Sequence, residues 1–154
     1  MAAPTLGLAV VDASVVAMWV LPERHSALAL ALAEDWAQAG IQAIAPCFMP
    51  TEVANAIFKR VQRGEISFDH AIEALDVVLG FGVRLEEEPE LHRRALALAY
   101  HLNRPTPYDA HYLALAELRG CAVWTGDERL YNATRGQFAW LRWIGAYTPA
   151  RRTL

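Results

Sequence analysis

The sequence predicts an α/β fold: a single domain over residues 1–154 with a central, mostly parallel sheet flanked by helices. Short apolar runs typical of buried strands alternate with longer segments in which apolar residues recur at helical spacing. A chain of 154 residues with 55% hydrophobic content is the right size for one domain with one core. No internal repeat, low-complexity tract or linker divides it.

In the first half of the chain, two strand-like runs alternate with helical patterns. An uninterrupted apolar run indicates a strand that is buried on both faces, whereas apolar residues at every third or fourth position indicate a helix. Pro22, Gly40 and Gly64 stand where helical patterns should stop. These signals predict a strand at 6–11, a short apolar stretch at 13–21, a helix at 23–39, a strand at 41–45 and helices at 50–64 and 67–79.

The second half continues the alternation. Pro89 suits the first position of a helix, and Gly120 marks the end of another. The acidic run at 86–88 is typical of a solvated loop. The signals predict a short strand at 80–85, helices at 89–102 and 106–118, a buried strand at 121–125, a short helix at 127–134 and a last strand at 138–144.

Composition limits the classes of partner and the cellular compartment. The formal net charge of −3 gives no overall positive field, so a nucleic acid would have to be met by a local patch of cations. Cys47 and Cys121 form no C-x-x-C pair and are interpreted as buried free thiols, which fits a reducing cytoplasm. No secretory signal and no apolar run of roughly 18 residues is present, so we expect a soluble, cytoplasmic protein with no membrane partner.

The most informative pattern is a set of acids at the starts of helices. Each follows a strand-like run or a turn, and the carboxyl ends of parallel strands gather at the edge of a sheet where ligands bind. Carboxylates held together there repel one another unless divalent cations, which prefer oxygen ligands, lie between them. The four acids are Asp12, Glu52, Asp109 and Asp127.

Each of these acids also has an ordinary structural interpretation. Asp12 and Asp127 could cap the helices that follow them. Glu52 lies in the first turn of its helix, where the dipole favours negative charge. Asp109 resembles the third helical position of a capping box with Thr106 as the N-cap. The recurrence of a carboxylate at all four junctions, where Ser, Thr or Asn would cap equally well, favours a shared site.

Other kinds of site find little support in the sequence. It contains no H-E-x-x-H, G-x-S-x-G, P-loop or G-x-G-x-x-G pattern. His111 lies two residues after Asp109 and so on a different face of its helix, which favours a surface or packing role over metal binding. The apolar residues Val15, Met18 and Trp19 are assigned to the core in preference to an interface.

The four acids lie in four longer segments that occur in a fixed order along the chain. They are Ala9-Val10-Val11-Asp12-Ala13-Ser14, Thr51-Glu52-Val53-Ala54-Asn55, Thr106-Pro107-Tyr108-Asp109-Ala110 with the Leu113 to Glu117 stretch, and Trp124-Thr125-Gly126-Asp127-Glu128-Arg129-Leu130. These segments resemble the motifs of PIN-domain ribonucleases, and within that family the chain most resembles the VapC toxins of prokaryotic toxin–antitoxin pairs. No single motif is very specific, but the four keep the family's order along essentially the whole chain.

The resemblance implies a metal-dependent endoribonuclease that uses Mg²⁺ or Mn²⁺ to hydrolyse RNA phosphodiester bonds. It also implies a homodimer and a VapB-like antitoxin partner. Asp12, Glu52, Asp109 and Asp127 carry over as catalytic carboxylates and metal ligands, and Ser14, Asn55 and Thr125 as supporting groups. The nearest sequence candidates for contacts with RNA phosphates are Arg60, Arg63, Arg104 and Arg129.

Three alternatives stay open at the level of the sequence. A non-catalytic PIN-like or receiver-like module could bind metal or a protein, although a receiver would need a Lys late in the chain and Lys59 is the only one. A phosphatase of the haloacid-dehalogenase type would need an Asp where Ser14 stands. A housekeeping RNA-processing nuclease would share the same site.

Overall fold

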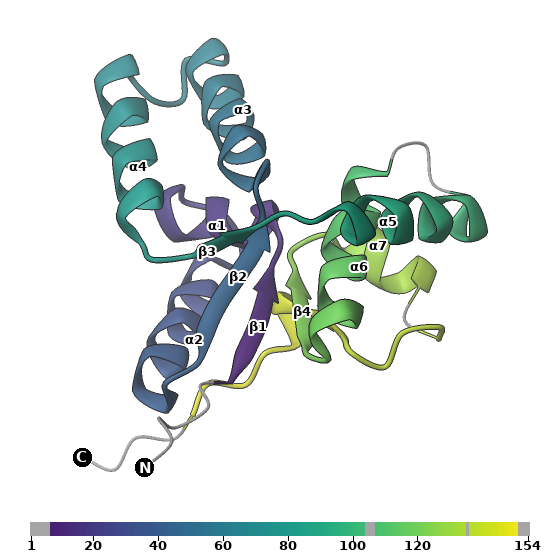
Figure 1. Cartoon of the computed structure of the whole chain (residues 1–154). Helices are drawn as coiled ribbons and strands as arrows, with labels where there is room; N and C mark the ends of the chain where they lie inside the picture. The colour runs from purple at the N-terminus through teal and green to yellow at the C-terminus, as the bar shows by residue number, and fades with distance from the viewer. Residues whose placement is uncertain (1–6, 104–106, 135, 151–154) are drawn as a thin grey trace.

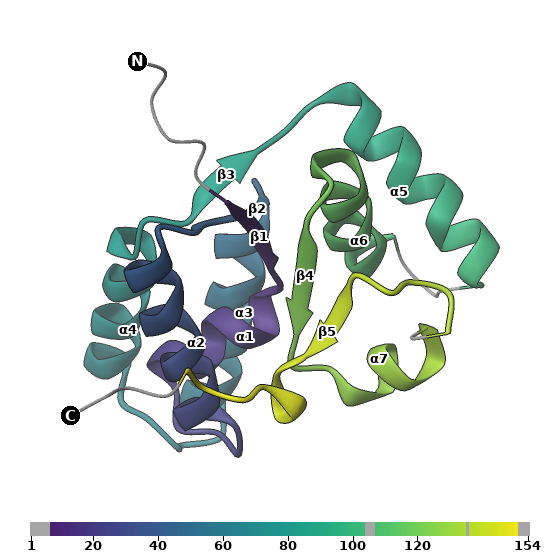
Figure 2. The same ribbon diagram turned by 90° about the horizontal axis from the view of Figure 1, so that it is seen from below.

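The computed structural model describes residues 7–103, 107–134 and 136–150 and contains one five-stranded sheet in the order β3-β2-β1-β4-β5, with every neighbouring pair parallel (Figure 1, Figure 2). The strands are β1 (Leu8–Val11), β2 (Gln42–Pro46), β3 (Arg84–Glu86), β4 (Ala122–Thr125) and β5 (Leu141–Trp143). The helices are α1 (Ala13–Val20), α2 (Ser26–Ala39), α3 (Met49–Gln62), α4 (Phe68–Gly80), α5 (Pro89–Leu102), α6 (Tyr108–Arg119) and α7 (Glu128–Thr134), and a 3₁₀ turn, η1, spans Ile144–Ala146. The predicted α/β class with a parallel sheet is confirmed.

Helices cover both faces of the sheet (Figure 2). On one face α6 packs against β1, β2 and β4, and α5 packs on the outside of α6. On the other face α1 and α2 contact the sheet, while the α3–α4 pair packs against α1. Because all strands are parallel, the carboxyl ends of β1, β2 and β4 lie at one edge, and the helices that follow them begin there.

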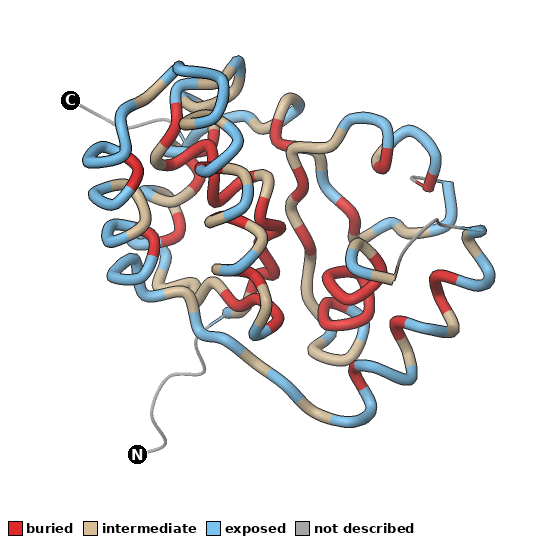
Figure 3. The backbone as a smooth tube through the Cα atoms, turned by 90° about the horizontal axis from the view of Figure 1, so that it is seen from above, coloured by how far each residue is buried: buried red, intermediate tan, exposed pale blue. Residues whose placement is uncertain are grey.

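The core lies where strands and central helices meet, as the red segments of Figure 3 show. Residues 110–116 of α6 are all buried because that helix is enclosed between the sheet and α5, which explains its apolar side chains on every face. Val15, Met18 and Trp19 of α1 are also buried, as expected from the sequence.

Three element boundaries differ from the prediction by three residues or more. Helix α2 begins at Ser26 rather than residue 23, because the Ser26 hydroxyl accepts a hydrogen bond from the Glu23 N–H and donates one to the Leu21 carbonyl, which holds this segment in a turn. Strand β3 begins at Arg84, since α4 continues through Gly80. Strand β5 begins at Leu141 rather than residue 138, because the Leu141 N–H donates to the Phe138 carbonyl and closes a turn, and it ends at Trp143 because η1 follows directly.

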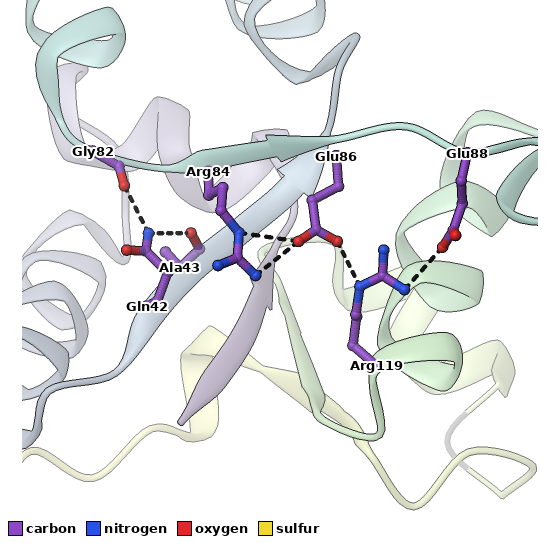
Figure 4. Close-up of polar contacts among 7 residues, drawn as sticks. All are labelled: Gln42, Ala43, Gly82, Arg84, Glu86, Glu88 and Arg119. Atoms are coloured by element: carbon purple, nitrogen blue, oxygen red, sulfur yellow. Dashed lines mark hydrogen bonds and ion pairs between the residues drawn. The ribbon is translucent and has the colours of Figure 1, made fainter. Parts of the chain in front are cut away.

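Charged side chains join β3 to the end of α6 (Figure 4). Arg119 Nε donates to Glu86 at 2.6 Å, its Nη1 lies 2.8 Å from Glu88, and Arg84 Nη2 donates to Glu86 at 2.8 Å. The Glu86 side chain is only 13% exposed. The prediction that this acidic run is solvated is therefore wrong for Glu86, whose carboxylate is held between two guanidinium groups.

The prediction that both cysteines are buried is wrong for Cys47. Both thiols are free, but Cys47 is exposed in the turn after β2, whereas Cys121 is half-buried before β4. Pro46 ends β2 one residue earlier, so the side chain of Cys47 no longer belongs to the buried strand. None of the described helices has the length and apolar character needed to span a membrane.

Candidate acidic active site

Asp12 lies at the junction of β1 and α1 and is buried, with 8% of its surface exposed. Its backbone N–H continues the parallel ladder by donating to the Trp124 carbonyl of β4. Although Asp12 occupies the N-cap position of α1, its side chain makes no capping hydrogen bond. Its Oδ2 instead accepts from the hydroxyls of Ser14 and Thr125, both at 2.8 Å. The carboxylate is therefore oriented toward the site and is not used to cap its own helix.

The Asp12 carboxylate is costly to keep ionised in the absence of a cation. Its pKa is raised from 3.8 to about 6, chiefly because the group is buried. The hydrogen bonds from Ser14 and Thr125 act in the opposite direction, and the charges of Asp109 and Glu52 contribute to the rise. The last two effects show that the three carboxylates, which come from three separate helix starts, influence one another electrostatically.

Ser14 and Thr125 bind the β1–α1 junction to the β4–α7 junction. The Ser14 hydroxyl also accepts from the Gly126 N–H at 2.8 Å, and the Thr125 hydroxyl accepts from the Asp127 N–H at 3.0 Å. A Cβ atom at Gly126 would lie 2.5 Å from the Met18 methyl group and 3.2 Å from the Ser14 hydroxyl. A side chain at this position would therefore have to displace the end of Met18 and would crowd Ser14, so a glycine favours the close approach of the two junctions.

Glu52 lies in the first turn of α3 and is half-buried. The hydroxyl of Tyr112, from α6, donates to Glu52 Oε1 at 2.6 Å. Burial raises the pKa of Glu52, the hydrogen bond from Tyr112 lowers it, and the charge of Asp109 raises it. Like Asp12, Glu52 is a carboxylate that the fold orients by a hydroxyl donor.

Asp109 and Asp127 have different surroundings. Asp109 lies in the first turn of α6, and its charge raises the pKa of both Asp12 and Glu52. Asp127 Oδ1 accepts from the backbone N–H groups of Arg129 and Leu130 at 3.0 and 3.1 Å and so caps α7. Asp12, Glu52 and Asp109 are thus near enough to influence one another electrostatically, whereas Asp127 caps α7 at the adjacent junction.

The chemistry of these donors suits a divalent cation. Carboxylate oxygens are the ligands that Mg²⁺ and Mn²⁺ prefer. Burial, with the charges of neighbouring acids, raises the pKa of Asp12 and Glu52, and a bound cation would offset this cost of keeping them ionised. In the described segments, however, no three His, Cys, Asp or Glu side chains lie close enough to hold a metal ion as they stand. Binding of an ion would therefore have to draw the carboxylates together.

The remaining candidates fall into three groups. Asn55 is exposed on α3, Arg63 at the C-cap of α3, and Arg129 on α7. Arg60 is instead engaged in ion pairs with Glu23 at 3.0 Å and Glu65 at 2.9 Å. Arg104 lies outside the described residues, as does Thr106, which was the expected N-cap of the capping box.

His111 has the packing role that its position predicted. It is buried, its Nδ1 lies 2.7 Å from the Pro107 carbonyl oxygen, and its Nε2 lies 3.0 Å from His92 Nδ1. Since the Pro107 carbonyl only accepts, His111 donates through Nδ1 and both ring nitrogens have partners. This histidine supports the start of α6, which carries Asp109.

The sequence interpretation overlooked Tyr112. It is three residues after Asp109, a spacing that places both side chains on one face of α6, and this signal could have identified it. The identity of its partner could not be found in the same way, because Glu52 is 60 residues away in the chain.

Comparisons with known proteins concern the family and the fold of the chain. The model of the PIN domain family matches residues 9–136. Over 126 residues the chain is 32% identical to Ribonuclease VapC3 of Pyrobaculum aerophilum, an alignment that covers 79% of this chain and 90% of that protein. The fold is similar to the crystal structure of PAE2754 from Pyrobaculum aerophilum, with a TM-score of 0.65, 23% identity, and coverage of 92% of this chain and 93% of that one.

Proposed function

Because this chain belongs to the PIN domain family, we propose that it is a metal-dependent endoribonuclease that hydrolyses RNA phosphodiester bonds as the toxin of a toxin–antitoxin pair. The observation that supports this most directly is electrostatic: the charges of Asp109 and Glu52 raise the pKa of Asp12, and the charge of Asp109 raises the pKa of Glu52. The similarity to Ribonuclease VapC3 supports RNA as the substrate.

In this proposal Asp12, Glu52 and Asp109 hold one or two Mg²⁺ or Mn²⁺ ions, with Asp127 acting directly or through water. Such ions supply a nucleophile at neutral pH and neutralise charge that develops on the phosphate. Ser14 and Thr125 keep Asp12 aimed at the site, and Tyr112 does the same for Glu52. The products would carry a 5′ phosphate and a 3′ hydroxyl.

Cations near the site are the candidates for holding the RNA backbone. Lys59 is exposed on the same face of α3 as Glu52, and Arg129 is exposed at the start of α7 beside Asp127. Arg60 is a weaker candidate than its sequence position suggested because Glu23 and Glu65 hold its guanidinium. A site with few cations on a chain of net charge −3 favours short contacts with single-stranded RNA.

The proposed role implies two protein partners. A VapB-like antitoxin would cover the acidic site, and a second copy of the chain would form a homodimer. A short neighbouring reading frame that encodes a DNA-binding protein would support the toxin role over a housekeeping nuclease, and copurification with that protein would test the pairing.

The test is cleavage of a single-stranded RNA by the purified wild type, Asp12→Ala and Asp109→Ala in the presence of Mg²⁺ or Mn²⁺. We expect the wild type to cleave, EDTA to stop the reaction, and both variants to lose at least about 100-fold in rate. Asp69→Ala is the matched control, because Asp69 also lies in the first turn of a helix but on exposed α4. Wild-type rates in the Asp12 and Asp109 variants would contradict the proposal, and turnover of a small phosphate ester instead of RNA would favour a phosphatase.

A further inference from the structure

We propose that the exposed ring of Tyr108 is a stacking platform for an unpaired nucleobase, next to the RNA phosphate that lies at the acidic site. This inference rests on the proposed function, because it assigns the subsite that would receive the base nearest the reacting phosphate.

Tyr108 is the first residue of α6 and directly precedes Asp109. Its side chain is 54% exposed, although a tyrosine ring is large and mostly apolar. Several other aromatic residues are exposed on the described surface, including Phe58, Phe68 and Tyr100. Tyr108 differs from them because it adjoins a carboxylate whose charge reaches both Asp12 and Glu52.

A chain of ring contacts connects Tyr108 to the interior of the site. Tyr112, which is 2% exposed, donates to Glu52 at 2.6 Å. The Phe48 ring lies edge-on to Tyr112 with centroids 5.8 Å apart and edge-on to Tyr108 at 5.6 Å. Exposure increases from Tyr112 through half-buried Phe48 to Tyr108, so the three rings form a wall that begins at Glu52 and ends in solvent.

The geometry of this wall suits stacking. Phe48 also meets the buried His111 ring edge-on at 5.1 Å and is thereby held by three rings. Its contact with Tyr108 has an interplanar angle of 77°, and such a T-shaped contact leaves at least one face of the Tyr108 ring uncovered by Phe48. Phe48, which the rings of Tyr112 and His111 hold in place, thus supports Tyr108 from one side, and this support reduces the conformational freedom that Tyr108 loses when a base stacks on it.

The expected ligand is a base that is not paired in a duplex. The faces of paired bases are covered by their neighbours, whereas a base in a single strand or loop can be splayed out onto an aromatic side chain. Stacking on a ring face does not depend on hydrogen-bonding edges, so we expect tolerance of base identity at this position. Tyr108 would therefore favour unpaired RNA over duplex RNA without specifying a sequence.

The test uses the Asp12→Asn chain, which would bind RNA without cutting it, and short oligonucleotides that carry 2-aminopurine at successive positions. We expect fluorescence quenching at one position in this background and loss of that quenching in Tyr108→Ala. Tyr108→Ala should also weaken binding by about fivefold to 150-fold, the range measured for loss of one stacked base. Tyr108→Phe, which keeps the ring, should recover most of what Tyr108→Ala loses.

A second measurement separates stacking from a general structural role. An oligonucleotide that lacks the one base at the quenched position should bind the parent chain and the Tyr108→Ala chain about equally, because a single contact cannot be lost twice. Phe68→Ala is the control, since Phe68 is 65% exposed at the start of α4. It should leave both binding and quenching as they are in the parent chain.

The outcomes distinguish this inference from the proposed function. RNA cleavage by the wild type together with unchanged binding and quenching in Tyr108→Ala would overturn the inference alone. If quenching depends on Tyr108 but the wild type never cuts RNA, the proposed reaction is overturned and the platform stays in place. If the wild type neither binds nor cuts RNA, both are wrong.

Discussion

The Tyr112 hydroxyl donates a 2.6 Å hydrogen bond to Glu52 and so joins the middle of α6 to the first turn of α3. Burial, together with the charges of Asp12 and Glu52, raises the pKa of Tyr112 above its ordinary range, so this hydroxyl remains a donor at physiological pH. A permanent donor fixes the Oε1 atom of Glu52 and so the orientation of its carboxylate.

Tyr112→Phe should therefore reduce kcat for RNA cleavage by roughly tenfold or more, because it removes one hydrogen bond to a charged group without changing the ring. The KM for RNA should change little, since Tyr112 is buried behind Glu52. Steady-state kinetics at saturating Mg²⁺ checks this. An equal loss in kcat and in affinity for RNA would indicate general damage to the fold and not a role in placing Glu52.

Asp12 should make the metal-free protein less stable at neutral pH. Its pKa is raised to about 6 in the folded protein from an ordinary value of 3.8, so the folded chain holds this proton more tightly than the unfolded chain does. The stabilisation from protonation is complete below the lower value and is lost as the pH rises through the higher one. Asn does not titrate, so the free energy of unfolding of Asp12→Asn minus that of the wild type should increase by about 2 to 3 kcal/mol between about pH 4 and pH 7.5.

Urea unfolding of both chains in EDTA across that range measures this difference. Taking the difference between the two chains cancels the titration of other groups. A difference that stays constant with pH would show that Asp12 is not desolvated in solution.

A divalent cation should stabilise the wild type by mass action. An ion that binds the folded chain at 100 times its Kd contributes about 2.7 kcal/mol, which is a shift of several degrees in Tm for a chain of this size. The shift should be clearly smaller in Asp12→Asn and unchanged in Asp69→Asn, whose carboxylate is exposed on α4. Differential scanning calorimetry with and without Mn²⁺ tests this, and equal shifts in the wild type and Asp12→Asn would count against a shared site.

Lys59 and Arg60 are neighbours in sequence with different expected roles. Lys59 lies seven residues after Glu52, about 10 Å along the same face of α3, and is exposed. Lys59→Ala should weaken RNA binding and leave the free energy of unfolding unchanged. The slope of log binding constant against log salt concentration should decrease by the amount expected for about one phosphate contact. Arg60→Ala should instead lower the free energy of unfolding by up to about 1 kcal/mol, because it removes ion pairs to Glu23 and Glu65.

Fluorescence anisotropy over a series of salt concentrations, combined with urea unfolding, separates the two effects. Arg63→Ala is a useful control, since Arg63 is 63% exposed and its Nη1 lies 3.9 Å from Glu65, at the outer limit of an ion pair. A larger loss of RNA affinity in Arg60→Ala than in Lys59→Ala would reverse this assignment.

Much of this arrangement could be predicted from the sequence because it depends on local pattern and on topology. Strands and helices follow from periodicity, and a parallel sheet places every strand-to-helix junction of the same kind at one edge. Asp12 and Glu52 lie at this edge for that reason, because they belong to the starts of the helices that follow β1 and β2. Asp109 lies near them because α6 leads into β4, and a helix that precedes a parallel strand begins at the same edge. The capping interpretation holds for Asp127 because its partners lie two and three residues away, within the reach of a local pattern.

Contacts between distant segments could not be predicted in the same way. The pairing of Tyr112 with Glu52 spans 60 residues, and the ion pair between Arg60 and Glu23 spans 37. Glu86 belongs to an acidic run that is typical of a solvated loop, but the fold brings Arg119 to it from 33 residues away. In each case the partner depends on how helices pack across the sheet, which periodicity within one segment does not encode.

The two edge strands of the sheet, β3 and β5, are each three residues long, and β3 carries the Arg84 and Glu86 side chains. Edge strands that are this short and charged offer few free backbone groups to a strand from another molecule. This discourages the edge-to-edge pairing that leads to aggregates. A second subunit is therefore expected to attach through helices, and such an assembly could separate again without unravelling either sheet.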